Sequence, residues 1–226
     1  MVIVEICTDN LQDTKEAIAA GADRIELCSD LGNDGLTPSV ELLSDVLELA
    51  RRHQVPVFPM VRCRAGDFVY TDEEKRCMIK QAVVFVEMGV PGVVIGGLTA
   101  DMRPDIEFIA EFAKVVKSEK PNVGFTFHKA IDYVELLEGE TLADIVATLE
   151  PYCDRVLTSG GCATAVEGAS EIRKMADRKR PPCPITAGKV RAHNAVELLE
   201  LTGATEIHSR SIDLCKALGK TPRGEV

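Results

Sequence analysis

Short runs rich in β-branched and apolar residues recur eight times along the chain, and a segment of helical pattern follows each run. The runs cover residues 2–7, 24–28, 57–61, 92–96, 123–128, 155–159, 184–188 and 206–208. A new run begins about every 30 residues, which suits a repeated strand, loop, helix, loop unit. Eight such units in series predict an α/β fold, a TIM-barrel-like (β/α)8 parallel barrel.

A doubly wound open sheet is the competing fold for such an alternation. That fold often carries a G-x-G-x-x-G turn after its first strand, and the turn here reads Thr8, Asp9, Asn10. No Pro/Ser-rich linker divides the chain, so we expect one barrel domain over residues 1–208. Residues 209–226 are then a C-terminal tail, in which the eighth helix must be short, displaced or absent.

Helix boundaries can be predicted from capping residues. We expect N-caps at Asn10, at Thr37 before Pro38, and at Thr71, where Glu74 completes a capping box. Three glycines occupy positions typical of helix ends: Gly21, Gly89 and Gly203.

Composition excludes several classes of protein. The formal net charge is −10, the chain has no Trp, and aromatic residues make up only 4%, so we expect no nucleic-acid partner. No run of apolar residues is long enough to cross a membrane, and the N-terminus lacks a signal-peptide pattern, which favours a cytoplasmic location. The eight cysteines contain no C-x-x-C motif and are expected to be free thiols.

Strand alternation places charged residues on the inner face of the barrel. Glu5 in the first strand, and Arg24 and Glu26 in the second, share the face opposite the apolar residues. Buried charges are costly unless they are paired, and Arg24 can pair with either glutamate. Both an internal salt bridge and a polar ligand site are therefore open interpretations.

Further polar residues follow the ends of later strands, where barrel enzymes carry their chemistry. Arginine and lysine suit the recognition of carboxylate or phosphate, and Gly160 and Gly161 could offer backbone amides to an anion. We predict His128 as an acid/base residue, with Glu26 or Glu5 as its carboxylate partner. The predicted substrate-binding residues are Arg24, Arg62, Arg64, Asp67, Ser159, Lys189 and His208.

Two cysteines end adjacent predicted strands on the inner face. Neighbouring strands lie about 4.8 Å apart, so Cys7 and Cys28 could clamp a soft ion such as Cu(I). We predict these two thiols as the metal ligands. The other cysteines are expected to be small buried hydrophobes, apart from a rim thiol at Cys63.

The sequence resembles the CutC family of copper-homeostasis proteins. The resemblance is carried by residues 5–7, 21–28, 35–39, 62–70, 125–128, 155–160 and 202–208. It implies a TIM-barrel-like fold, a cytoplasmic homo-oligomer, and a role in copper handling with Cu(I) bound through cysteine. The family pattern differs at three places: Cys63 replaces a proline, Lys129 an arginine, and Ala187 with Lys189 two glycines of a triplet.

Three functional hypotheses follow. The first is a copper-homeostasis protein that binds Cu(I) through Cys7 and Cys28. The second is a barrel enzyme that acts on a small anionic substrate at the C-terminal mouth. The third is an assembly protein whose incomplete eighth unit exposes an adhesive barrel flank.

Overall fold

The computed structural model describes residues 2–224 and shows eight parallel strands in a nearly closed barrel, as the sequence predicts. The sheet order is β3-β2-β1-β8-β7-β6-β5-β4. The strands are β1 (Ile3–Thr8), β2 (Arg24–Leu27), β3 (Val57–Pro59), β4 (Gly92–Ile95), β5 (Gly124–Phe127), β6 (Arg155–Thr158), β7 (Cys183–Thr186) and β8 (Glu206–Ser209).

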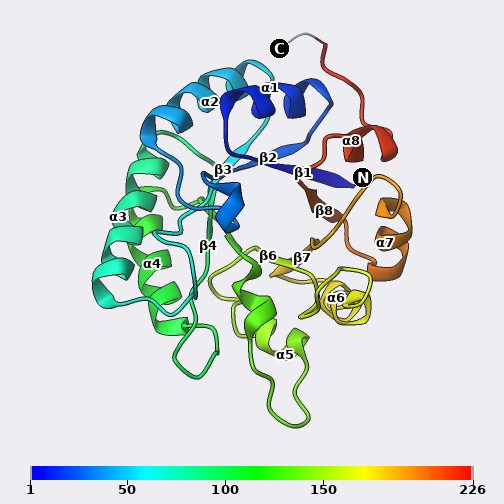
Figure 1. The fold of residues 1–226 in the computed structure, drawn as a ribbon. Helices are drawn as coiled ribbons and strands as arrows, with labels where there is room; N and C mark the ends of the chain where they lie inside the picture. Colours follow the sequence, from blue (N-terminus) through cyan, green and yellow to red (C-terminus); the bar gives the residue numbers. More distant parts are fainter. Residues whose placement is uncertain (1, 225–226) are drawn as a thin grey trace.

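Helices surround the strands on the outside of the barrel (Figure 1). The α-helices are α1 (Leu11–Ala19), α2 (Val40–Arg52), α3 (Asp72–Glu87), α4 (Ile106–Glu119), α5 (Leu142–Ala147), α6 (Ala169–Asp177), α7 (Ala195–Thr202) and α8 (Asp213–Ala217). Two short 3₁₀ helices, η1 (Leu31–Asn33) and η2 (Lys129–Tyr133), follow β2 and β5. They bring loop residues over the C-terminal ends of the strands.

The barrel closes weakly between β3 and β4. A single parallel bridge pairs Met60 with Val94, and the Val61 amide donates to the Val94 carbonyl at 2.8 Å. The β1–β2 pair, in contrast, aligns four residues, including Glu5 opposite Arg24 and Cys7 opposite Glu26. The register therefore concentrates the inward charges on β8, β1 and β2.

The aliphatic core lies between the strands and the helices. Val4, Ile6, Ile25 and Leu27 point outward from β1 and β2 and are almost fully buried in this core. Burial of such side chains contributes roughly 1.5–3 kcal/mol each. Their alternating partners point into the barrel, which places Glu5, Arg24 and Glu26 inside, as predicted.

Most predicted helix caps are confirmed. Asn10 accepts from the Asp13 amide at 2.8 Å, and Thr71 with Glu74 forms the capping box of α3. The N-cap predicted at Thr37 is wrong, because Ser39 caps α2. The Thr37 hydroxyl instead bonds to the backbone of Arg62, accepting from its amide and donating to its carbonyl, both at 2.9 Å. Thr37 thus joins the β2–α2 loop to the end of β3.

The eighth helix is short, as expected, yet it packs on the barrel. Leu214 and Cys215 of α8 are fully buried. Farther along, the Arg223 side chain donates to the Ala22 carbonyl at 2.7 Å. These contacts cover the flank that the third hypothesis leaves exposed. Within residues 2–224, no helix combines the length and apolar character that crossing a membrane would require.

Candidate functional site

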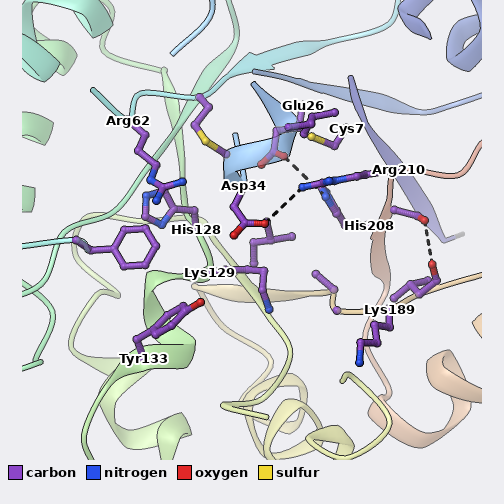
Figure 2. A pocket seen from close by; sticks show the side chains of 18 of the residues that line it. Cys7, Glu26, Asp34, Arg62, His128, Lys129, Tyr133, Lys189, His208 and Arg210 are labelled. Carbon is purple, nitrogen blue, oxygen red and sulfur yellow. Dashed lines mark hydrogen bonds and ion pairs between the residues drawn. The ribbon is translucent and has the colours of Figure 1, made fainter. Parts of the chain in front are cut away.

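A cavity of about 400 Å³ opens at the C-terminal ends of the strands (Figure 2). Its lining residues are spread along the chain, from Cys7 on β1 to Arg210 just after β8. Six residues predicted from the sequence line it: Cys7, Glu26, Arg62, His128, Lys189 and His208. Part of the predicted set therefore meets at the mouth of the barrel, and the rest lies elsewhere.

Below this cavity, a network of ion pairs fills the barrel interior. Arg24 pairs with Glu5 through Nε and with Glu206 through Nη2, the latter at 2.6 Å. Burial alone would raise the pKa of Glu5, but the Arg24 charge and a hydrogen bond with His208 lower it to about 2. Glu5 and Arg24 belong to this network and do not line the cavity. Arg24 pairs with Glu5 rather than Glu26 because Glu5 stands opposite it in register.

His208 connects the network to the cavity floor. Its Nδ1 lies 2.8 Å from Glu5 Oε1, and its Nε2 lies 3.8 Å from Glu26 Oε2. Ligand atoms of Cys7, Glu26 and His208 all lie within 4.8 Å of one another. Burial raises the pKa of Glu26, and Glu26 Oε1 has no hydrogen-bond partner among residues 2–224. These three side chains, which point toward one another in Figure 2, could hold a metal ion.

The two predicted metal-binding thiols lie side by side. Cys7 Sγ and Cys28 Sγ are 3.4 Å apart, and both residues are buried. The hydrogen bond with Cys28, burial and the nearby Glu26 raise the pKa of Cys7 well above its usual range. Cys7, Cys28 and Met60 belong to one small apolar cluster. Cys7 and Met60 also line the cavity, whereas Cys28 does not. The cluster therefore contains three sulfur-bearing side chains.

Arg62 is buried at the cavity wall without an acidic partner. Its guanidinium donates to three backbone carbonyls, those of Asn33, Gly35 and Gly66, at 2.9–3.1 Å. It also stacks over the Phe68 ring, 4.9 Å from the centroid. Among the ion pairs of residues 2–224, none involves Arg62, so its positive charge is compensated only by dipoles.

His128 faces the same cavity as a neutral ring. Burial and the Arg62 charge lower its pKa to about 3. Nδ1 accepts a hydrogen bond from the Ala130 amide at 3.1 Å, so the proton of the neutral ring is on Nε2. Nε2 is buried and has no partner within the described part of the chain. The ring rests on Gly96, where a Cβ would lie 2.3 Å from His128 Cε1.

Two predicted substrate-binding residues lie away from the cavity. Arg64 pairs with Asp67 at 2.9 Å and with Glu74 at 2.6 Å, and neither Arg64 nor Asp67 belongs to the lining. Strand alternation would place Arg62 and Arg64 on the same face, but β3 ends at Pro59, so both lie in the following loop, where alternation no longer holds. Glu74 lies in the first turn of α3, so Arg64 ties the β3–α3 loop to its helix.

Ser159 is buried under the rim and does not line the cavity, and its hydroxyl donates a hydrogen bond to Asp132. The Asp132 carboxylate also accepts from the Gly161 amide at 2.9 Å, and Lys129 pairs with it at 2.6 Å. The amides predicted to bind an anion are therefore used within the protein, that of Gly161 by Asp132 and that of Gly160 by the Thr158 hydroxyl at 2.8 Å. Helix α6 begins only at Ala169, which removes the helix start assumed for that site.

Three cationic lining residues were not predicted as site residues: Lys129, Arg191 and Arg210. Each follows the end of a strand, the location from which the other candidates came. Arg210 was missed because the eighth run was ended at residue 208, whereas β8 continues to Ser209. Arg210 lies 3.7 Å from Asp34, also a lining residue that the sequence did not indicate.

The cavity is electropositive although the chain is acidic. Five lining side chains are cationic (Arg62, Lys129, Lys189, Arg191 and Arg210), and only Glu26 and Asp34 are acidic. The chain as a whole carries −10. A cleft lined mostly by one sign of charge raises the local concentration of small ions of the opposite sign.

Comparison with known proteins identifies the family. The family model described as the CutC family matches residues 2–213. The chain belongs to the CutC family. A family protein CutC of Aliivibrio fischeri is 37% identical over 208 residues, covering 91% of this chain and 80% of the relative. The corresponding Xylella fastidiosa protein is 36% identical over 222 residues, covering 97% of this chain and 79% of the relative.

Solved structures agree with this assignment. A CutC protein from Streptococcus agalactiae, provisionally named for copper homeostasis, superposes with a TM-score of 0.86 at 25% identity. The match covers 94% of this chain and all of that one. A Bacillus anthracis dihydrodipicolinate synthase gives a TM-score of 0.64 at 14% identity over 96% of this chain and 72% of that enzyme, which shows the barrel fold alone.

Proposed function

We propose that this CutC protein binds Cu(I) as cargo through the thiol pair of Cys7 and Cys28. The observation that carries the proposal is the 3.4 Å separation of the two sulfur atoms at the edge of an open cavity. Soft thiolate and thioether donors select Cu(I) over harder ions. The copper-homeostasis name of the Streptococcus agalactiae relative agrees with this proposal.

The geometry favours a bent site with a third soft ligand. With metal–sulfur bonds of about 2.3 Å, a linear two-thiolate site needs sulfur atoms about 4.6 Å apart. The thiols lie closer than this, so bound Cu(I) leaves one side free. Met60 belongs to the same apolar cluster as both cysteines and lines the cavity, and its thioether is the candidate for that side.

Titration of the reduced protein with Cu(I) against a colorimetric chelator tests the proposal. Cys28→Ala should weaken Cu(I) binding at least tenfold, because one thiolate cannot hold the ion alone. Cys153→Ala removes an equally buried thiol in the main core and is the matched control. Equal affinity of the wild type and both variants would contradict the thiol-pair site.

A second function is favoured by the electropositive cavity. We propose that the barrel mouth binds a small anion, as an enzyme acting on a carboxylate or phosphate compound would. Three groups support this role: the buried Arg62 without an acidic partner, the free Nε2–H of His128, and the exposed Lys189. In this role His128 donates a hydrogen bond from its neutral ring to a substrate oxygen, as a lowered pKa permits.

Calorimetric titration with inorganic phosphate and with citrate tests anion binding. Lys189→Ala should weaken binding severalfold, because it removes one of the five cationic charges at the mouth. Lys114→Ala, which removes an exposed charge on α4 away from the cavity, is the control. Identical binding by the two variants would contradict an anion site at the mouth.

A further inference from the structure

We propose that Cys7, Glu26 and His208 form a second metal site, for a divalent ion such as Zn²⁺, on the floor of the cavity. Their ligand atoms lie within 4.8 Å of one another and offer one sulfur, one oxygen and one nitrogen donor. Zn²⁺ accepts all three donor types, whereas Cu(I) prefers sulfur. The site shares Cys7 with the thiol pair but takes its other two ligands, Glu26 and His208, from outside that pair.

The sheet topology brings these donors together. β1 is the central strand of three, with β2 on one side and β8 on the other. Cys7 stands opposite Glu26 in register, and Glu5, two residues before Cys7, stands opposite His208. Each donor therefore comes from a different strand of one rigid sheet, which fixes the separation between the donors better than loops would.

The orientation of His208 is already suited to a metal. Its Nδ1 lies 2.8 Å from the buried Glu5 carboxylate, and Glu5 is held in turn by Arg24. A carboxylate bonded to Nδ1–H fixes the tautomer of a metal-binding histidine and leaves the Nε2 lone pair for the ion. His208 Nε2 lies on the cluster side, 3.8 Å from Glu26 Oε2, too far for a hydrogen bond between them.

Glu26 supplies the second observation that points to a cation. The residue is 2% exposed, and its Oε1 has no hydrogen-bond partner in residues 2–224. A buried carboxylate is costly unless a cation or donors satisfy it. Arg24, which lies on the same strand as Glu26, bonds to Glu5 and Glu206 instead. A divalent ion would complete the coordination that the protein leaves open.

Three protein ligands leave a fourth position, which faces the cavity. Cys7, Glu26 and His208 all line it, together with the five cationic side chains of the mouth. Zinc sites with three protein ligands and one open position are typical of catalysis, because water or a substrate oxygen takes the fourth place. The fourth ligand of the bound ion would therefore be a water or an anionic group held in this cavity.

Because Cys7 is common to both sites, single variants can separate them. The affinities for Zn²⁺ and for Cu(I) are measured by chelator competition in the wild type, His208→Gln, Glu26→Gln and Cys28→Ala. We expect His208→Gln and Glu26→Gln to weaken Zn²⁺ binding by about 100-fold or more, since even indirect metal contacts are worth about 10–100-fold. Cys28→Ala should leave Zn²⁺ affinity within about threefold.

A spectroscopic measurement tests the ligand set directly, and its main reading is made on the wild-type protein. Co²⁺ added to the wild type should give a near-ultraviolet thiolate-to-metal band, and this band should persist in Cys28→Ala and disappear in Cys7→Ala. Loss of Zn²⁺ binding in Cys28→Ala equal to that in His208→Gln would overturn the separate site. So would unchanged Zn²⁺ affinity in both His208→Gln and Glu26→Gln. Failure of Cu(I) binding alone would leave this site standing.

Discussion

The two ends of the barrel interior bury charged residues to a similar degree but satisfy them differently. At the lower end, Glu5 is bonded to Arg24 and His208, and Arg24 is bonded to Glu5 and Glu206, so that Arg155 Nη1 alone lacks a partner in this network among the described residues. At the mouth, Glu26 Oε1 and His128 Nε2 have no partners among the described residues. A buried polar atom without a partner costs about 1–3 kcal/mol. The lower end therefore stabilises the fold, whereas the mouth keeps polar atoms free for a ligand.

The largest expected effect is at the lower end. Arg24→Met leaves Glu5 and Glu206 buried without their main cation. We expect a loss of about 3–5 kcal/mol in the free energy of unfolding, the usual cost of breaking a buried ion pair. Urea denaturation measures it. Arg155→Met, whose Nε contacts Glu206 at 3.3 Å from a more exposed position, should lose clearly less. Equal losses would mean that the lower network is not the stabilising element.

Gly92, which begins β4, and Gly96, which follows its last residue, allow the effect of a Gly→Ala substitution to be compared between the lower end and the mouth of the barrel. A Cβ at Gly92 would lie 2.1 Å from the Phe58 ring and 2.6 Å from the Gly124 carbonyl oxygen, whereas the three atoms nearest to one at Gly96 all belong to the His128 ring. Gly96→Ala should cost about 1–3 kcal/mol, the usual range for overpacking. Gly92→Ala should cost more, because backbone cannot move aside as a side chain can. Of the two variants, only Gly96→Ala should also weaken phosphate binding, because it displaces the His128 ring. Weaker phosphate binding in Gly92→Ala but not in Gly96→Ala would contradict a role for His128 in the anion site.

A pH-dependent effect of about 2 kcal/mol is expected at the mouth. Because the pKa of His128 is lowered to about 3, the unfolded chain binds a proton below pH about 6.5 while the folded protein does not. Stability is therefore complete above pH 6.5 and falls as the pH drops toward 3, by about 2 kcal/mol at pH 5. Chemical denaturation at pH 7.5 and 5 should show this fall reduced in His128→Gln but not in His193→Gln, an exposed control. A fall of the same size in both variants would contradict a neutral buried His128.

The smallest expected effect has the opposite sign. Glu26→Gln should raise the free energy of unfolding of the metal-free protein by about 1 kcal/mol, because it removes a poorly satisfied buried charge. Functional residues often carry such a cost to stability. Thermal unfolding with chelator present measures the change, and Glu111→Gln on the exposed face of α4 is the control. Destabilisation by Glu26→Gln would place Glu26 with the lower network instead.

Much of the fold could be predicted because its signals are local. The strand runs, the Asn10 cap and the Thr71–Glu74 capping box depend on residues close in sequence. Thr37 shows the limit of such signals, since its hydroxyl is taken by Arg62, 25 residues away. A tertiary hydrogen bond competed with the local cap, and Ser39 was available to replace it.

The candidate site was predicted in part, for the same reason. Alternation determined by itself that Glu5, Arg24, Glu26 and Cys7 point into the barrel, and position after a strand indicated His128 and Lys189. Only the tertiary structure decided which of these groups are satisfied. Pairing depends on the neighbouring strand and its register, which placed Arg24 beside Glu5 and left Glu26 beside Cys7 and His208. Strand pairing therefore separates the charges that stabilise the fold from those that remain free to bind a ligand. A charge is satisfied by the groups near it in space, and the order of residues along the chain does not specify those groups.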